Sequence, residues 1–175
     1  MRIDSRAIRD AYVYLLGRCF VIRQEHTDRS ATDFAYNRII YNPLGSADFI
    51  NPNLDVAYLE AWIAVDEHSC AVLEVPEVTG RYYTAQLLDE WGEVIANINE
   101  RATPLTPHGR FALAAPGTSP VIPDDAVRLD LHSRKAKLLA RVELKGDAEG
   151  AVALQRAFQL EHPVTKPSRT RGLIR

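Results

Sequence analysis

Residues whose types suit binding or catalysis are concentrated between positions 51 and 97. The segment opens with Asn51-Pro52-Asn53-Leu54-Asp55-Val56-Ala57-Tyr58, in which Pro52 stiffens a turn between Asn53 and the strand that follows. Asn53 and Asp55 can hydrogen-bond the local backbone and start that strand, which is a purely structural role. A carboxamide and a carboxylate on a rigid turn can also orient a ligand or exchange a proton with it. The residue types alone leave both roles open.

A second polar group lies in Arg81-Tyr82-Tyr83-Thr84-Ala85-Gln86-Leu87-Leu88-Asp89. As a strand, this segment alternates faces, so Arg81, Tyr83 and Asp89 share one side and Gln86 faces the other. Arg81 and Asp89 would be about 26 Å apart along a straight strand, so they cannot pair directly. A mid-strand glutamine needs a partner for its amide if it faces inward, and has no such need if it faces outward.

These positions define the candidate site. Asp55 and Asp89 are the expected acid–base residues, and Arg81 or Arg141 would hold an anionic group. The expected ligand-contacting residues are Asn53, Tyr58, Arg81, Tyr83, Gln86 and Arg141. The five histidines are scattered, with none at metal-ligand spacing from another, so no metal ligand is assigned. No glycine-rich phosphate loop or Gly-x-Ser-x-Gly elbow is present, and the cofactor stays unknown.

Short segments rich in β-branched and aromatic residues must position these side chains. Each is bounded by Pro, Gly or Asp, and they cover 56–65, 71–75, 81–89, 93–98, 110–115, 126–131 and 136–144. The third and fourth can pair in sequence as a meander. No long helix separates the segments, so the pattern favours a mainly β (α+β) fold, an antiparallel β-sandwich of jelly-roll type or a partly open barrel, over alternating β–α units.

Helices are expected at both ends of this β-region. Residues 5–25 predict an amphipathic helix with Ser5 as N-cap. Its apolar face comprises Ile8, Tyr12, Leu15, Leu16, Cys19 and Phe20. Residues 33–40 form a second short helix or an irregular arm, and residues 147–160 a closing helix capped by Asp147. The chain therefore reads as one domain over 1–162, followed by a mobile basic tail over 163–175.

Composition narrows the class of protein. With 175 residues, 46% hydrophobic and 25% charged, the chain is long enough for one domain with a real core. A net charge of −2 with mixed signs predicts neither nucleic acid nor an anionic membrane as partner. No secretory signal or membrane span is apparent, so a soluble, cytoplasmic protein is expected. Cys19 and Cys70 are interpreted as two small buried hydrophobes in a reducing compartment.

Several of these segments, in this order and spacing, resemble the bacterial family called domain of unknown function 1254. They are Ala11-Tyr12-Val13-Tyr14, Pro52 to Tyr58, Ala61-Trp62, Val75-Pro76, Arg81-Tyr82-Tyr83, Gln86 to Asp89, Gly109 to Leu113, Leu138 to Arg141, and the helix from Ala148 to Leu160. The resemblance covers about residues 7–160. One departure is Val56, where the family usually carries threonine directly after the motif aspartate.

The resemblance implies a β-sandwich module with N-terminal helical decoration. In longer relatives this module precedes a second sandwich, the domain of unknown function 1214, so the expected partner here is a separate partner sandwich domain or a second copy in a homodimer. The resemblance carries no settled activity. We therefore expect a small-molecule-binding or subunit-interaction module. The alternative is an enzyme that acts on a small anionic or saccharide-like metabolite through Asp55, Arg81 and Asp89.

Overall fold

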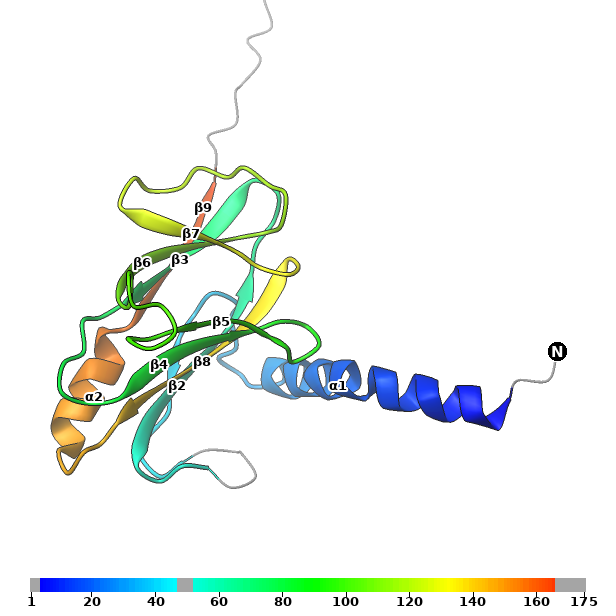
Figure 1. The fold of residues 1–175 in the computed structure, drawn as a ribbon, viewed down its shortest axis with the longest axis horizontal. Coiled ribbons are helices and arrows are strands. Elements are labelled where there is room, and N and C mark those ends of the chain that lie inside the picture. The colour runs from blue at the N-terminus through cyan, green and yellow to red at the C-terminus, as the bar shows by residue number, and fades with distance from the viewer. Residues whose placement is uncertain (1–3, 47–51, 166–175) are drawn as a thin grey trace, which may run out of the picture.

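Two β-sheets form the body of the molecule in the computed structural model, which describes residues 4–46 and 52–165 (Figure 1). The five-stranded sheet has the order β1-β2-β8-β4-β5, and the four-stranded sheet the order β7-β6-β3-β9. Paired strands are antiparallel except β6 and β7, which are parallel. The mainly β sandwich with a helix near each end, predicted from turn spacing, is confirmed.

The strands lie close to the predicted segments. Their bounds are β1 (Ile40–Tyr41), β2 (Val56–Ala64), β3 (Ser69–Val75), β4 (Tyr83–Leu88), β5 (Val94–Ile98), β6 (Gly109–Ala114), β7 (Ala126–Asp130), β8 (Lys135–Glu143) and β9 (Gln159–Thr165). β4 and β5 pair in sequence, as the meander predicted. In β8, buried and partly buried residues alternate strictly, so one face of the sheet supplies the core and the other carries the polar side chains.

The core lies between the two sheets. From β8 it receives Ala136, Leu138, Ala140 and Val142, and from the opposite sheet Leu73, Phe111 and Leu113. Because alternate residues of the five-stranded sheet are committed to this core, the intervening ones must face outward. That outer face carries the candidate site.

The C-terminal region differs from the sequence prediction. Helix α2 (Ala148–Ala157) starts at the predicted cap, where the Asp147 carboxylate accepts a hydrogen bond from the Gly150 backbone N–H at 2.9 Å. It ends before Phe158, which is extended and fully buried. The chain then continues as β9, which pairs with β3. The predicted last turn of the helix is absent, because Phe158 is buried in the core and the residues after it pair with the edge of β3. Residues 166–175 of the predicted tail lie outside the described residues.

Of the two alternatives for residues 33–40, the irregular arm is confirmed, because residues 33–39 form turns and irregular backbone before the short strand β1. Two predictions fail near the N-terminus, the N-cap of the first helix and the burial of Cys19. Helix α1 (Ser5–Arg29) begins at the predicted residue and runs four residues beyond the predicted end at 25. Its N-cap is Asp4 and not Ser5, because the Asp4 carboxylate accepts a hydrogen bond from the Arg6 backbone N–H. The predicted burial of Cys19 is wrong, since Cys19 is exposed, whereas Cys70 is buried as expected and both thiols are free.

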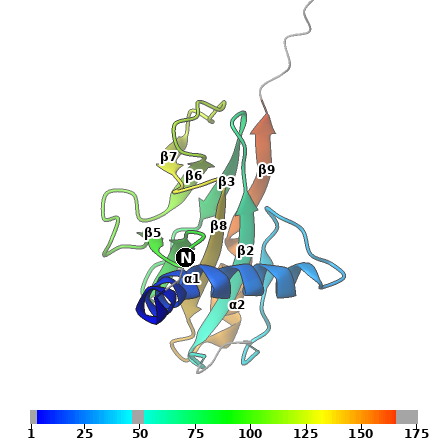
Figure 2. The same ribbon diagram turned by 90° about the vertical axis from the view of Figure 1, so that its right-hand side faces the viewer.

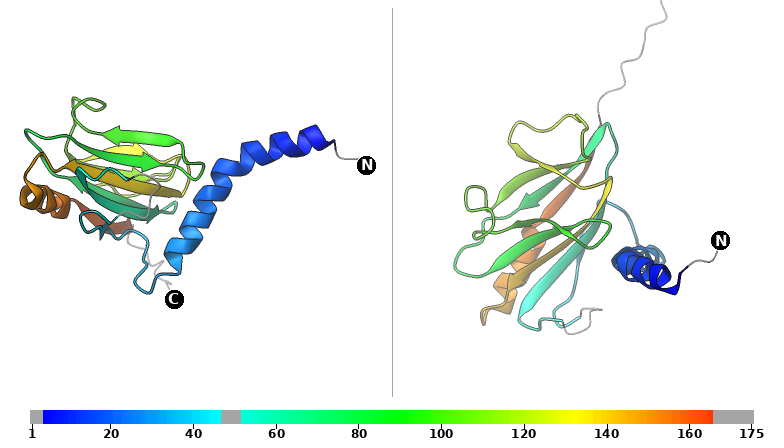
Figure 3. Two further views of the ribbon diagram at one scale, coloured as in Figure 1. Left: turned by 90° about the horizontal axis from the view of Figure 1, so that it is seen from below. Right: turned by 45° about the vertical axis from the view of Figure 1, so that its right-hand side comes forward.

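Helix α1 extends well beyond the sandwich (Figures 1 and 3). Residues 5–13 are all exposed, and the C-terminal half crosses in front of the five-stranded sheet (Figure 2). Within the described ranges, neither helix is long and apolar enough to cross a membrane.

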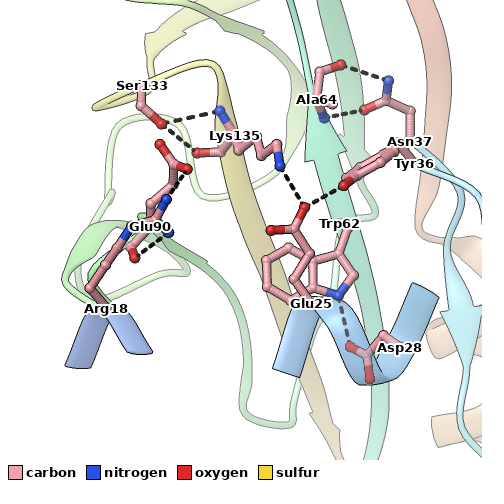
Figure 4. Close-up of polar contacts among 10 residues, drawn as sticks. All are labelled: Arg18, Glu25, Asp28, Tyr36, Asn37, Trp62, Ala64, Glu90, Ser133 and Lys135. Atoms are coloured by element: carbon pink, nitrogen blue, oxygen red, sulfur yellow. Dashed lines mark hydrogen bonds and ion pairs between the residues drawn. The ribbon is translucent and has the colours of Figure 1, made fainter. Parts of the chain in front are cut away.

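Polar contacts fasten the last turns of α1 to the sheet (Figure 4). Glu25, only 8% exposed, accepts hydrogen bonds from Lys135 Nζ at 2.7 Å and from the hydroxyl of Tyr36. Burial alone raises the pKa of Glu25, but the contacts with Lys135 and Tyr36 outweigh it and hold that pKa below its ordinary value. One turn later, the indole N–H of Trp62 donates to Asp28 at 2.7 Å. The C-terminal end of α1 therefore has a fixed position.

The middle of α1 is held against the β4–β5 turn. Arg18 donates to the Glu90 carboxylate at 2.8 Å and to the Glu90 carbonyl at 2.9 Å. A Cβ at Gly17 would lie 2.9 Å from the Trp91 carbonyl oxygen, so only glycine permits this approach. The ring of Tyr14 packs on that of Trp91, with centroids 5.2 Å apart. Helix and sheet thus meet along one side of α1.

Candidate functional site

A polar cleft lies on the outer face of the five-stranded sheet. Strand register places Arg141 on β8 between Tyr58 on β2 and Thr84 on β4, and Gln86 on β4 opposite Asn97 on β5. Two adjoining hollows of about 450 and 320 Å³ share Tyr82, Arg101 and Arg141. We call their combined lining the arginine cleft. It comprises Asn53, Asp55, Val56, Tyr82, Thr84, Gln86, Asn97, Asn99, Arg101, Ala102, Arg141 and Glu143.

Arg141 stands at the centre of this cleft. Its guanidinium carbon lies 5.8 Å from the centroid of the Tyr58 ring, which backs the side chain from the β2 side. Its Nε atom is buried, yet it has no hydrogen-bond partner among residues 4–46 and 52–165. No carboxylate within those ranges forms an ion pair with Arg141 either. A buried donor without an acceptor is uncommon and costs stability.

A second arginine faces the same cleft from the loop after β5. The guanidinium of Arg101 lies 5.6 Å from the centroid of the Tyr82 ring, and in the described part of the chain it has no carboxylate partner. Asn99 fixes the backbone of this loop, because its Oδ1 accepts from the backbone N–H groups of Arg101 and Ala102, both at 2.8 Å. Its Nδ2 donates to Thr84 at 3.2 Å. Buried Asn99 therefore joins the loop to β4.

The turn before β2 forms the acidic end of the cleft. The backbone N–H of Asn53 donates to the hydroxyl of Tyr58 at 3.0 Å, which ties the turn to the ring behind Arg141. Asp55 is exposed, and its carboxylate makes no ion pair or hydrogen bond with another described residue. The other acid, Glu143, accepts from the Tyr82 backbone N–H at 2.9 Å. The cleft is thus basic toward Asn97 and acidic toward Asp55.

Arg81 lies beside the cleft, but its side chain is engaged elsewhere. Its Nη1 donates to the carbonyl oxygens of Glu143, Leu144 and Asp147 at 3.2–3.3 Å, and its Nη2 pairs with the Asp147 carboxylate at 2.8 Å. These contacts hold the connection between β8 and α2. The geometry therefore gives Arg81 a structural task, and its predicted ligand contact stays a prediction.

Tyr83 points away from the outer face, as the alternation of β4 requires. It is 2% exposed, belongs to the core, and donates its hydroxyl to the Pro107 carbonyl oxygen at 2.6 Å. Burial, together with the charges of Glu100 and Glu77, raises the pKa of this phenol. Tyr83 and Arg81 also line a third hollow of about 440 Å³, which shares Tyr82 and Arg101 with the arginine cleft.

Asp89 lies at the other end of β4, where it organises the β4–β5 turn. It accepts from the backbone N–H groups of Trp91 at 2.8 Å and Glu93 at 2.9 Å, and from His132 Nδ1 at 2.8 Å. Burial alone raises its pKa, but His132 and the two backbone donors outweigh burial and lower it below its ordinary value. Asp89 borders an apolar groove beside α1 and is not part of the cleft lining.

Four of the expected residues therefore line one cleft, with a fifth behind it. Asn53, Asp55, Gln86 and Arg141 line the cleft, and Tyr58 backs it. Sequence reasoning missed Arg101 and the two asparagines. The available signal was alternation: Asn97 and Asn99 flank the core residue Ile98, and their side chains emerge on the outer face beside Gln86 and Thr84.

Comparison with known proteins assigns the chain to a family. A family model described as "Protein of unknown function (DUF1254)" matches residues 31–162. The chain belongs to the DUF1254 family. The matched DUF1254 region contains every residue of the arginine cleft, whereas α1 lies before it. No curated protein matches the chain.

The DUF1254 fold is also seen in a solved structure. The crystal structure of the VPA0106 protein from Vibrio parahaemolyticus is similar to this chain with a TM-score of 0.71 and 21% sequence identity. The similarity covers 90% of this chain and 41% of that protein. The chain thus spans about two fifths of the length of this relative, and the likeness concerns the fold alone.

Proposed function

We propose that this DUF1254 module binds a small anionic molecule in the arginine cleft, with Arg141 as the anchor of the anionic group. The observation that carries the proposal is the buried Arg141 Nε, which has no acceptor in the described part of the chain. No described carboxylate pairs with this guanidinium, which lines the cleft, and a bound oxyanion would supply both a hydrogen-bond acceptor and the missing counter-charge.

The charge distribution supports an anion at this position. Arg141 and Arg101 both face the larger hollow, whose lining includes no carboxylate. Two guanidinium groups facing one cleft attract an anion and repel a cation. The guanidinium carbons of Arg141 and Arg101 lie 5.8 and 5.6 Å from the centroids of the Tyr58 and Tyr82 rings, within the range of cation–π attraction. A guanidinium can make planar, two-point contact with a carboxylate.

The remaining lining suits a ligand that also carries hydroxyl or amide groups. The side-chain amides of Gln86 and Asn97 make no hydrogen bond to another described residue, so both can donate to and accept from a ligand. Asp55, at the opposite end, is an acceptor for hydroxyl or ammonium groups. A hydroxylated carboxylic acid therefore matches the cleft better than a simple inorganic anion.

The affinity experiment uses isothermal titration calorimetry with gluconate, citrate and phosphate as anionic probes and sorbitol as a neutral one. We expect saturable binding of gluconate and none of sorbitol. Arg141→Gln should weaken binding at least about tenfold, because it removes the charge and the two-point contact. Arg134→Gln is the matched control, since Arg134 is an exposed arginine outside the cleft, and its affinity should equal that of the unmodified chain.

A stability measurement separates binding from a structural role. If Arg141 serves a ligand, removing its unpaired buried donor should leave the ligand-free melting temperature unchanged or raise it. A loss of several degrees in Arg141→Gln would assign Arg141 to the fold. Absence of binding for all three anions at millimolar concentration would refute the proposal.

Catalysis is the second candidate function, and one observation favours it. Asp55 is a carboxylate without a described partner, at the rim of the same cleft. It would act as the acid–base group on a ligand held by Arg141. The other two residues of the catalytic hypothesis, Arg81 and Asp89, are occupied by backbone and side-chain partners. Asp55→Asn should then retain ligand affinity while abolishing turnover.

A further inference from the structure

The apolar groove that Asp89 borders is a further hollow on the outer face of the five-stranded sheet. Its volume is about 280 Å³, near the lower end of the range for small-molecule sites. It lies where helix α1 crosses in front of that sheet (Figure 2). We call it the apolar pocket. Its apolar walls are Phe20 and Val21 of α1 and Trp62, Leu88 and Leu139 of the sheet.

Ion pairs hold α1 on either side of the residues that line the apolar pocket. Arg18 pairs with Glu90 at 2.8 Å. Two turns later, buried Glu25 pairs with Lys135 at 2.7 Å (Figure 4). The pocket residues of α1 lie between these two attachments, within 20–24, so the chain itself supports the pocket. Water in an apolar hollow is displaced favourably by an apolar group.

The apolar pocket adjoins the arginine cleft on the same face of the sheet. Leu139 of the pocket is the cross-strand partner of Gln86 of the cleft. Directly opposite residues of antiparallel strands point to the same face, with Cβ atoms about 4.5–5.5 Å apart. Along β8, Arg141 is the next residue after Leu139 on this face, about 7 Å away. The two hollows therefore meet at the pair of Leu139 and Gln86.

We propose that the ligand of the arginine cleft is an amphipathic acid, whose carboxylate binds Arg141 and whose apolar chain runs along β8 into the apolar pocket. This inference rests on the proposed function, because it takes Arg141 as the anchor of the carboxylate. Lys137, the pocket residue of β8 farther from Arg141, lies about 14 Å along the strand, a length that roughly ten carbons span. A hydroxyl group near the carboxylate would lie beside the amide of Gln86. The ligand class is therefore a medium-chain hydroxy acid.

Two charged residues of the apolar pocket are already bound within the chain. The ammonium of Lys137 pairs with Glu60 at 2.6 Å and with Asp28 at 3.2 Å. The carboxylate of Asp89 is bound by His132 and by two backbone N–H groups. Neither group needs a charged partner from a ligand, and the stem of Lys137 adds apolar surface to the wall. This end of the pocket therefore suits the apolar end of the chain.

Arg23 offers a competing anchor for the carboxylate. It also lines the pocket, and its guanidinium lies 5.2 Å from the centroid of the Phe20 ring. Arg23 is exposed, so water weakens its attraction for an anion. The buried Nε of Arg141 is the better-shielded donor. The carboxylate therefore belongs at Arg141, and a pair of variants distinguishes the two positions.

Isothermal titration calorimetry of the full chain with straight-chain 3-hydroxy acids of four, six, eight and ten carbons tests the inference. Each methylene that enters the apolar pocket should raise the affinity roughly two- to fourfold. The ten-carbon acid should therefore bind at least about fiftyfold more tightly than the four-carbon acid. Arg141→Gln should weaken the binding of all four acids at least about tenfold, as it does for gluconate, whereas Arg23→Gln should change it less than about threefold.

Two substitutions on α1 locate the chain of the ligand. Phe20 and Ile22 are 51% and 48% exposed, so neither belongs to the core, but only Phe20 lines the apolar pocket. Phe20→Ser should weaken binding of the ten-carbon acid at least about threefold and leave the affinity for gluconate unchanged. Ile22→Ser is the matched control, and its affinities for both probes should equal those of the unmodified chain.

The outcomes separate this inference from the proposed function. Gluconate binding at Arg141, with equal affinities for the four- and ten-carbon acids, would overturn the inference and leave the proposed function standing. No binding of gluconate or of any hydroxy acid would overturn both. A chain-length effect that Arg23→Gln abolishes and Arg141→Gln does not would place the carboxylate at Arg23 and overturn the shared site. Equal losses in Phe20→Ser and Ile22→Ser would place the chain outside the apolar pocket.

Discussion

Arg81 gives the sharpest test of a structural against a ligand-binding role. Its guanidinium makes four contacts with the connection from β8 to α2, and its side chain is only 13% exposed. Three of these share Nη1, so they count as about two hydrogen bonds of about 1 kcal/mol each. The Asp147 partner is 55% exposed, so the ion pair adds only about 0.5 kcal/mol. Arg81→Ala should therefore lower the free energy of unfolding by about 2–3 kcal/mol.

For a chain of this length, that loss corresponds to a fall of about 5–10 °C in melting temperature. Thermal unfolding followed by tryptophan fluorescence measures this fall in melting temperature. Arg81→Lys should recover only part of the loss, because a lysine cannot bind the backbone carbonyls and the Asp147 carboxylate at once. Affinity for gluconate in the arginine cleft should stay within about threefold of the unmodified chain. A melting temperature of Arg81→Ala within about 2 °C of that of the unmodified chain, combined with lost affinity for gluconate, would refute the structural role of Arg81.

Three substitutions test other parts of the fold. Asp89→Asn should lower the free energy of unfolding by about 1–2 kcal/mol at pH 7, measured by urea unfolding. Folding lowers the pKa of Asp89, so the stabilisation by its carboxylate is present above the unfolded pKa of about 3.9 and is lost as the pH falls through the folded pKa. A difference in unfolding free energy between the variant and the unmodified chain that stays the same at about pH 2 would contradict the assignment. In a helix without close neighbours, Gly→Ala raises the free energy of unfolding by up to about 1 kcal/mol. Gly17→Ala should not show this increase, because the new Cβ would meet the Trp91 carbonyl oxygen. A melting temperature raised by the full amount would mean that α1 does not contact the β4–β5 turn. Phe158→Ala should cost about 3–5 kcal/mol in chemical denaturation because the ring is fully buried, and a loss below 1 kcal/mol would place Phe158 outside the core.

The sheet body could be predicted from the sequence because its signals are local. Turn residues bound each strand, and the strict alternation of β8 shows which residues face the core. The final strand was missed, because Phe158 and Leu160 fit a helical stripe as well as a strand. The segment is a strand because it pairs with the edge of β3, which lies more than 80 residues earlier in the chain. No local sequence pattern contains that contact.

The candidate site was predictable in part for the same reason. Gln86 is the one polar residue in the apolar centre of its strand, and Arg141 ends a segment that resembles the family. Strand register brings the two into one cleft. Arg81 and Asp89 were grouped with them because arginine and aspartate can serve ligands. Their actual partners include carbonyl and N–H groups of the backbone, which have no signature in the sequence. Arg101 depends on Asn99 to fix its loop, a contact visible only in three dimensions.

The central pairing of the five-stranded sheet has a consequence for how the protein is made. β2 and β8 join residues roughly 70 to 90 positions apart, so a ribosome adding about 5–20 residues per second completes β8 several seconds after β2. During that interval the apolar residues of β2 have no sheet to enter. Early-emerging β2 is therefore the segment most exposed to wrong association during synthesis, and the short, two-residue β1 offers it little protection.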